Sequence, residues 1–221
     1  MDSIIFDLDG TLWNSTDIVV ESWNQVLDDI FDNWPALTSN DLKSLFGRTL
    51  PDIAAMIFPD IPPEKQLELI ELCCIKEHEA LLEHNPPLFA GVPDTLAVLA
   101  QKYPLFIVSN CEAGYIELFL SVTGLGKYFR DHLCPGDTGN AKASNIKEII
   151  QRNSLKSPVY IGDTLGDHNA AREADIPFVF ASYGFGSVEN PEYMISSPTD
   201  LLQLFNLQVS PPLLSEGDCK Y

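Results

Sequence analysis

Two aspartates follow an apolar run near the start of the chain, in the sequence SIIFDLDGTLW (residues 3–13). The apolar run predicts a buried strand over residues 4–8, and the Gly-Thr pair after Asp9 predicts a turn. Two carboxylates about 4 Å apart repel by roughly 4 kcal/mol at an effective dielectric constant of about 20. Asp7 and Asp9 therefore predict a bound cation, and Mg²⁺ fits because it prefers oxygen ligands and also holds phosphate.

A carboxylate beside a metal and in front of a phosphoryl group is also a candidate nucleophile. Aspartate can form an aspartyl-phosphate. Residues two apart on an extended segment point the same way, so Asp9 is expected to reach the leaving oxygen of a group attacked by Asp7. This spacing predicts that Asp7 attacks and that Asp9 acts first as a general acid and then as a general base.

Polar residues also follow two later apolar runs. Ser109 and Asn110 end the run LFIVSN, and Asp163 ends the run PVYIGD. In a doubly wound sheet, ligands bind outside the carboxyl ends of the strands. We therefore expect these side chains to lie near Asp7 and Asp9.

The elements that must position these residues alternate between strand and helix from about residue 90 onward. Strand-like runs are predicted at 105–110, 158–163 and 177–184, with a weaker candidate at 132–137. Helices are predicted at 93–102, 112–122, 142–153 and 166–174. This alternation predicts an α/β fold with a doubly wound, mostly parallel sheet covered by helices on both faces.

Residues 16–85 are different, since they have helical patterns and no strand between them. The predicted domains are therefore a discontinuous α/β core (1–15 and 86–206), a small α-helical cap inserted after the first strand (16–85), and a C-terminal tail (207–221). A cap in this position can close over the carboxyl end of the first strand.

Four motifs in this order resemble the haloacid dehalogenase superfamily, in particular its DxDGT phosphatase branch. They are DLDGTL (7–12), the hydroxyl residue Ser109, Lys142 at a helix start, and GDTLGD (162–167). The helical insertion resembles the C1-type cap of phosphoglycolate-phosphatase-like members. The resemblance covers residues 1 to about 205 and implies a Rossmann-like core.

The resemblance also implies roles for individual residues. Asp7 is expected to be nucleophile and metal ligand, and Asp9 the general acid and base whose backbone carbonyl binds the metal. The remaining implied roles are direct metal ligation by Asp163, a water-mediated contact by Asp167, and phosphoryl binding by Ser109, the Asn110 amide and Lys142. Lys142 would also offset the charge of Asp7, and the metal would be Mg²⁺.

Two assignments have alternatives. Ala143 follows Lys142 where proline is frequent in the family, so Lys147, further along the same helix, is the second candidate. Arg48, in LFGRTL between two predicted cap helices, could bind a remote anionic group of the substrate or be a solvated surface residue. Trp13 could line the site or pack in the core.

Other residues are predicted to have no chemical role. His78 and His84 lie on a long polar helix and are expected at the surface, whereas Cys111 is expected to pack.

The overall composition limits the kinds of molecule that the protein is expected to bind. The 221 residues have a net charge of −19, from 13 basic and 32 acidic residues, which repels nucleic acid and anionic membranes. No apolar stretch approaches the roughly 20 residues of a membrane span, and no signal peptide is evident. The five cysteines match no zinc spacing and predict reduced thiols in the cytoplasm. We expect a monomer.

The leading hypothesis is a magnesium-dependent phosphatase that hydrolyses a small phosphorylated metabolite through an aspartyl-phosphate. A phosphomutase acting on a sugar phosphate would use the same motifs. A dehalogenase is disfavoured because that branch needs no second acid, and nothing singles out a Schiff-base lysine for a phosphonatase. A non-catalytic phosphate sensor on the same fold is the alternative from another class.

Overall fold

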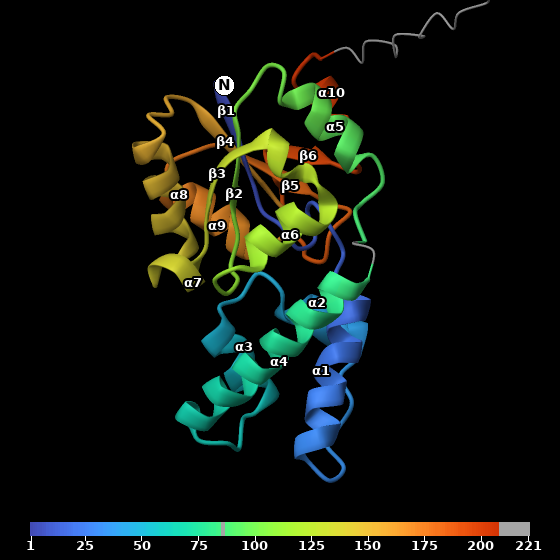
Figure 1. The fold of residues 1–221 in the computed structure, drawn as a ribbon. Coiled ribbons are helices and arrows are strands. Elements are labelled where there is room, and N and C mark those ends of the chain that lie inside the picture. The colour runs from blue at the N-terminus through green and yellow to red at the C-terminus, as the bar shows by residue number, and fades with distance from the viewer. Residues whose placement is uncertain (85–86, 208–221) are drawn as a thin grey trace, which may run out of the picture.

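The structure is a computed structural model that describes residues 1–84 and 87–207, and it contains one six-stranded parallel sheet (Figure 1). The strand order is β3-β2-β1-β4-β5-β6. The strands are β1 (Ser3–Phe6), β2 (Leu105–Val108), β3 (Phe129–Leu133), β4 (Pro158–Gly162), β5 (Phe178–Ala181) and β6 (Tyr193–Ile195). The predicted doubly wound parallel fold is confirmed.

Helices cover both faces of this sheet because the strands bury side chains on both sides. Ile4 and Phe6 of β1 face a cluster with α5 (Val92–Leu99), α6 (Tyr115–Thr123) and α10 (Asp200–Leu204). Ile5 faces the opposite cluster with α8 (Lys142–Arg152) and α9 (Leu165–Glu173). The near-continuous apolar strands are typical of a parallel sheet that is covered on both faces.

The central strand β1 fixes where a ligand can bind. It pairs in parallel with β2 on one side and with β4 on the other, so the connections leave it in opposite directions. The carboxyl end of β1 is therefore the switch point of the sheet, where the crevice of a doubly wound fold opens.

The elements near the edges of the sheet were predicted less well. The weak strand candidate at 132–137 lies too late, since β3 ends at Leu133 and the following residues form the short helix α7 (Pro135–Thr138). β6, α10 and the short 3-10 helix η1 (Leu125–Tyr128) were not predicted. These elements are short, so their apolar periodicity is too brief to read.

In the part of the chain that the structure describes, four helices lie between β1 and α5, and they gather beyond one end of the sheet, on the side opposite the N-terminus (Figure 1). They are α1 (Thr16–Ile30), α2 (Ser39–Leu45), α3 (Leu50–Ile57) and α4 (Pro63–Glu83). They bury an apolar cluster of their own, which includes Trp23, Leu42 and Phe58. Among the described residues, no helix has the length and apolar composition needed to cross a membrane.

Two parts of the predicted domain organisation stay predictions. The predicted boundary at residues 85 and 86 and the predicted tail from residue 208 onward lie outside the described residues. Leu207, the first residue of the predicted tail, packs against the core.

Candidate active site

Three buried carboxylates meet at the carboxyl ends of β1 and β4. Asp7 directly follows β1, and Asp163 directly follows β4. Oxygen atoms of Asp7, Asp163 and Asp167 all lie within 4.8 Å of one another. The structure therefore brings together two of the strand-end acids that the sequence singled out, and adds the acid from the first turn of α9.

The turn after β1 allows this approach because Gly10 has no side chain. Gly10 has a φ of +82°, a left-handed conformation that favours glycine. A Cβ at this position would lie 2.2 Å from Oδ2 of Asp163. The glycine of the first motif is thus required both by the backbone conformation and by the proximity of Asp163.

Lys142 lies between two of the acids. Its Nζ donates to Oδ1 of Asp7 at 2.9 Å and to Oδ1 of Asp167 at 2.6 Å, and the side chain is 5% exposed. Burial alone would lower the pKa of Lys142, but Asp167 and Asp7 outweigh burial and raise it. Lys147, the alternative, is exposed and pairs with Glu173 at 3.3 Å. The structure therefore places Lys142, and not Lys147, against Asp7.

Both oxygens of Asp167 are engaged by the protein. Thr164 and Asp167 form a capping box at the start of α9, in which Oδ2 of Asp167 accepts from Thr164 N at 2.9 Å and from Thr164 Oγ1 at 2.6 Å. Its Oδ1 accepts from Lys142. Asp167 therefore caps a helix and holds the lysine at the same time.

Two contacts that the sequence analysis missed hold Asp163. Phe185 N donates to Oδ2 at 2.7 Å, and Thr11 Oγ1 donates to Oδ1 at 3.3 Å. Thr11 belongs to the first motif, DLDGTL, so its place beside the two aspartates could have indicated a role in the site. Phe185 follows β5, and no sequence pattern indicated it.

Ser109 and Asn110 lie at the carboxyl end of β2, beside Asp7. Ser109 is buried, and its hydroxyl is one of the groups that stabilise the charged form of Asp7. Nδ2 of Asn110 donates to the backbone oxygen of Gly47 at 2.8 Å, which links the sheet to the loop between α2 and α3. No hydrogen-bond partner for the buried Oδ1 of Asn110 is found in the described parts of the chain.

A cleft of about 420 Å³ opens beside Asn110, between the start of α3 and the core. Its lining residues are Thr49, Leu50, Pro51, Asn110, Cys111, Glu112, Pro135, Gly136, Gly139, Asn140 and Ala141. Cys111 is buried with its side chain in the apolar cluster under α6, as expected for a packing residue.

The second aspartate of the first motif faces hydroxyl groups. Oδ1 of Asp9 accepts from Ser15 Oγ at 2.7 Å and from the Tyr115 hydroxyl at 3.1 Å. Trp13 is fully buried and packs against Tyr115 and Phe119 in the core, and its side chain also lies beside Asp9, where it favours the charged form of that carboxyl and so lowers its pKa.

Burial dominates the acidity of the site. It raises the pKa of Asp7 to about 6, with a further increase from Asp167 and an opposing effect of Lys142. It likewise raises the pKa of Asp9 to about 7 and that of Asp163 well above its usual value. These shifts mean that the folded protein alone compensates the negative charge incompletely.

The donor set fits a divalent cation. Asp7, Asp163 and Asp167 offer three carboxylates against the single ammonium of Lys142, so ionised acids leave an excess of two negative charges. The available ligand atoms are all oxygens, as Mg²⁺ prefers.

Arg48 and His78, which lie outside the acidic cluster, differ in their exposure to solvent. Arg48 is exposed, and its Nε donates to the Ser44 carbonyl oxygen at 3.3 Å, next to the cleft residue Thr49. The prediction that His78 is a surface residue is wrong, because its ring stacks on Tyr115 and its Nε2 lies 2.8 Å from Oε1 of Glu112. Packing of α4 against α6 covers this part of the polar helix.

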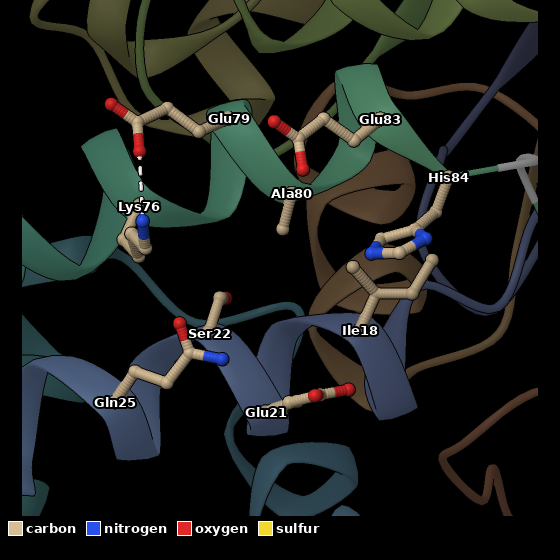
Figure 2. A pocket seen from close by; sticks show the side chains of 9 residues that line it. All are labelled: Ile18, Glu21, Ser22, Gln25, Lys76, Glu79, Ala80, Glu83 and His84. Carbon is tan, nitrogen blue, oxygen red and sulfur yellow. Dashed lines mark hydrogen bonds and ion pairs between the residues drawn. The ribbon is translucent and has the colours of Figure 1, made fainter.

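A second hollow lies between α1 and α4, away from these residues (Figure 2). Its volume is about 110 Å³, and Glu21, Glu79 and Glu83 line it. Its lysine, Lys76, is paired with Glu79 at 3.0 Å, as the dashed line in Figure 2 shows. His84, predicted at the surface, is exposed at its edge. This hollow shares no residue with the candidate active site.

Comparison with known proteins agrees with this arrangement. The profile of the haloacid dehalogenase-like hydrolase family matches residues 4–181. The chain belongs to this family. The resemblance seen in the four motifs is thereby confirmed, and the chain is a hydrolase by family.

Curated relatives of this hydrolase are similar over most of its length. The pyrophosphatase PpaX of Anoxybacillus flavithermus is 26% identical over 220 residues, which cover 94% of this chain and 98% of the relative. The phosphoglycolate phosphatase of Escherichia coli K12 is 27% identical over 169 residues, 72% of this chain and 67% of the relative.

A solved structure supports the fold of the hydrolase. A haloacid dehalogenase-like hydrolase from Streptococcus pneumoniae superposes with a TM-score of 0.80 at 22% identity, covering 93% of this chain and 98% of that protein.

Proposed function

We propose that this hydrolase is a magnesium-dependent phosphatase that acts on a small phosphorylated metabolite through an aspartyl-phosphate on Asp7. The observation that carries the proposal is the buried contact of Lys142 with Asp7, next to Asp163, at the switch point of the sheet. The curated relatives, named phosphatases and pyrophosphatases, agree with this reaction class.

In the first step, a carboxylate oxygen of Asp7 bonds to phosphorus as the bond from phosphorus to the leaving oxygen breaks. Asp9 gives a proton to the leaving oxygen. In the second step, Asp9 accepts a proton from the water that attacks the aspartyl-phosphate, which releases phosphate and restores Asp7. Ser109, the Asn110 amide and Lys142 hold the phosphoryl oxygens throughout.

Mg²⁺ would be held by Asp7, Asp163 and the backbone carbonyl of Asp9, with Asp167 acting through water. It would supply positive charge that orients the phosphoryl group and offsets its negative charge in the transition state.

The helices of residues 16–85 are proposed to act as a cap over a core formed by residues 1–15 and 86–206. The cleft between Thr49 of the cap and Asn110 of the core would then receive the leaving group. Arg48 directly precedes the cleft residue Thr49, and its terminal guanidinium nitrogens would contact an anionic group of the substrate while its Nε donates to the Ser44 carbonyl. A cytoplasmic, monomeric protein is proposed from the acidic composition and from four free thiols among the described residues.

The function is tested by measuring free phosphate released from a panel of phosphorylated metabolites, with Mg²⁺ or with a chelator. The panel includes phosphoglycolate, pyrophosphate, nucleoside monophosphates and sugar phosphates. Turnover that requires Mg²⁺ is the expected result. Conversion of a sugar phosphate with little free phosphate would indicate a mutase instead, and binding without turnover would indicate a sensor.

Replacing Asp163 with asparagine should raise the Mg²⁺ concentration for half-maximal activity by about tenfold or more, because even residues that only support metal ligands contribute this much affinity. Titration of activity with Mg²⁺ measures the change. The exposed Asp60→Asn is the matched control and should leave the titration unchanged. An unaltered metal requirement in Asp163→Asn would show that the ligand lies elsewhere.

A further inference from the structure

Two hydroxyl groups meet one oxygen of the proposed general acid. Ser15 Oγ lies 2.7 Å and the Tyr115 hydroxyl 3.1 Å from Oδ1 of Asp9, and the two hydroxyl oxygens are 3.3 Å apart. Tyr115 is 106 residues from Asp9 in the chain and begins α6. No role follows for Tyr115 from the motifs, since it belongs to none of them.

This arrangement distinguishes the two oxygens of the Asp9 carboxyl. In a protonated carboxyl group, one oxygen carries the proton and donates, while the other accepts. Ser15 Oγ donates to Oδ1, and the single proton of the Tyr115 hydroxyl is directed either to Oδ1 or to Ser15 Oγ, which strengthens the Ser15 bond. Both arrangements favour Oδ1 as the acceptor. Oδ2 is then the atom that carries the proton.

Tyr115 is held firmly enough to impose this choice. Its side chain is buried, and its ring packs edge-on against Trp13 with a centroid separation of 5.6 Å. On another side the ring stacks on His78 of α4, with centroids 5.7 Å apart and an angle of 27° between the planes. Nε2 of His78 lies 2.8 Å from Oε1 of Glu112, a close approach without hydrogen-bond geometry. The position of the hydroxyl therefore depends on both the sheet core and α4.

We propose that Tyr115 is a positioning residue, which together with Ser15 directs the acidic proton of Asp9 from Oδ2 toward the leaving oxygen. This inference rests on the proposed phosphatase reaction. As the bond from phosphorus to the leaving oxygen breaks and the bond from Asp7 to phosphorus forms, the proton passes from Oδ2 of Asp9 to the leaving oxygen, which departs as an alcohol. Asp9 remains as a carboxylate, and the two hydroxyls at Oδ1 stabilise its new charge.

The test compares two phosphate esters of similar size that differ in their need for the acid. The alkoxide of benzyl phosphate is a poor leaving group and must be protonated, whereas p-nitrophenolate departs without a proton. Tyr115→Phe keeps the ring contacts with Trp13 and His78 and removes only the hydroxyl. We expect it to lower kcat/KM about tenfold for benzyl phosphate and less than about threefold for p-nitrophenyl phosphate, a fraction of the full effect of a general acid.

Tyr183→Phe is the matched control. It also removes a partly buried tyrosine hydroxyl near the site, but this hydroxyl donates to the backbone oxygen of Thr11 at 2.9 Å and not to Asp9. The ratio of the two kcat/KM values should therefore stay as in the wild type. Equal losses for both esters in Tyr115→Phe would show a purely structural role and overturn the inference.

A double-mutant cycle gives the second readout. In an Asp9→Ala background, Tyr115→Phe should cause no further loss of kcat/KM, because its effect passes through Asp9. A further loss would overturn the positioning role while leaving the phosphatase assignment intact. Absence of wild-type turnover of both esters and of the whole metabolite panel with Mg²⁺ would overturn the proposed function and the role of Tyr115 together.

Discussion

Replacing Asp7 with asparagine is expected to abolish turnover while the protein stays folded. The amide is a poor nucleophile, so the phosphoryl group has no acceptor, and kcat should fall by at least about 10⁴-fold, as for other enzyme nucleophiles. Phosphate release with Mg²⁺ measures the loss, and circular dichroism checks the fold. Retained turnover in Asp7→Asn would refute the assignment of the nucleophile.

The same substitution should stabilise the metal-free protein at high pH. Burial raises the pKa of Asp7 from 3.8 to about 6, so the folded state holds this proton more tightly than the unfolded state. The free energy of unfolding of the wild type should therefore decrease as pH rises from about 3.8 to about 6. Without the carboxyl group, unfolding at pH 8 in a chelator should cost about 1–3 kcal/mol more, and the gain should vanish near pH 4.

Replacing Lys142 with methionine is expected to remove activity and stability together. The variant leaves Asp7 and Asp167 buried beside each other without their cation, which typically costs about 3–5 kcal/mol. It also removes a charge that we propose for the phosphoryl oxygens, so kcat should fall about 10²–10³-fold, as for the loss of one transition-state donor. Urea unfolding and phosphate release measure the two effects.

The loss of unfolding free energy in Lys142→Met should increase with pH. Lys142 lowers the pKa of Asp7 against the larger effect of burial, so its removal should raise that pKa further. The destabilisation should therefore be larger at pH 8 than at pH 5 in a chelator. Lys147→Met is the control, because Lys147 is exposed, and it should change the unfolding free energy by less than about 0.5 kcal/mol. Equal stability of Lys142→Met and wild type at pH 8 would contradict the buried ion pairs.

The class of fold and most of its elements could be read from the order of residues along the chain. The apolar runs at β1, β2, β4 and β5 were readable because strands buried on both faces are almost continuously apolar. The long helices α1 and α4 were readable from their periodicity. β3 and β6 were misplaced or missed, since the partly exposed residues of edge strands carry no clear pattern.

The sequence also indicated which acids should meet, because the carboxyl ends of parallel strands share one edge of the sheet. That argument predicts that Asp7 lies close to Asp163, and the order of the motifs indicates that Lys142 joins them. It left Lys147 open as an alternative. The choice between the two lysines depends on which side of α8 faces the sheet, and helix packing decides that.

The residues that surround Asp9, and the contacts of the first helices with the core, became evident only in the folded molecule. The contact of Tyr115 with Asp9, the stacking of His78 on Tyr115 and the bond from Asn110 to Gly47 all join segments that are far apart in the chain. The physical reason is that strand-end residues are placed by backbone pairing, which follows one regular geometry even between strands far apart in the chain. Contacts between helices depend instead on how whole side-chain surfaces pack, and no short pattern in the sequence encodes that.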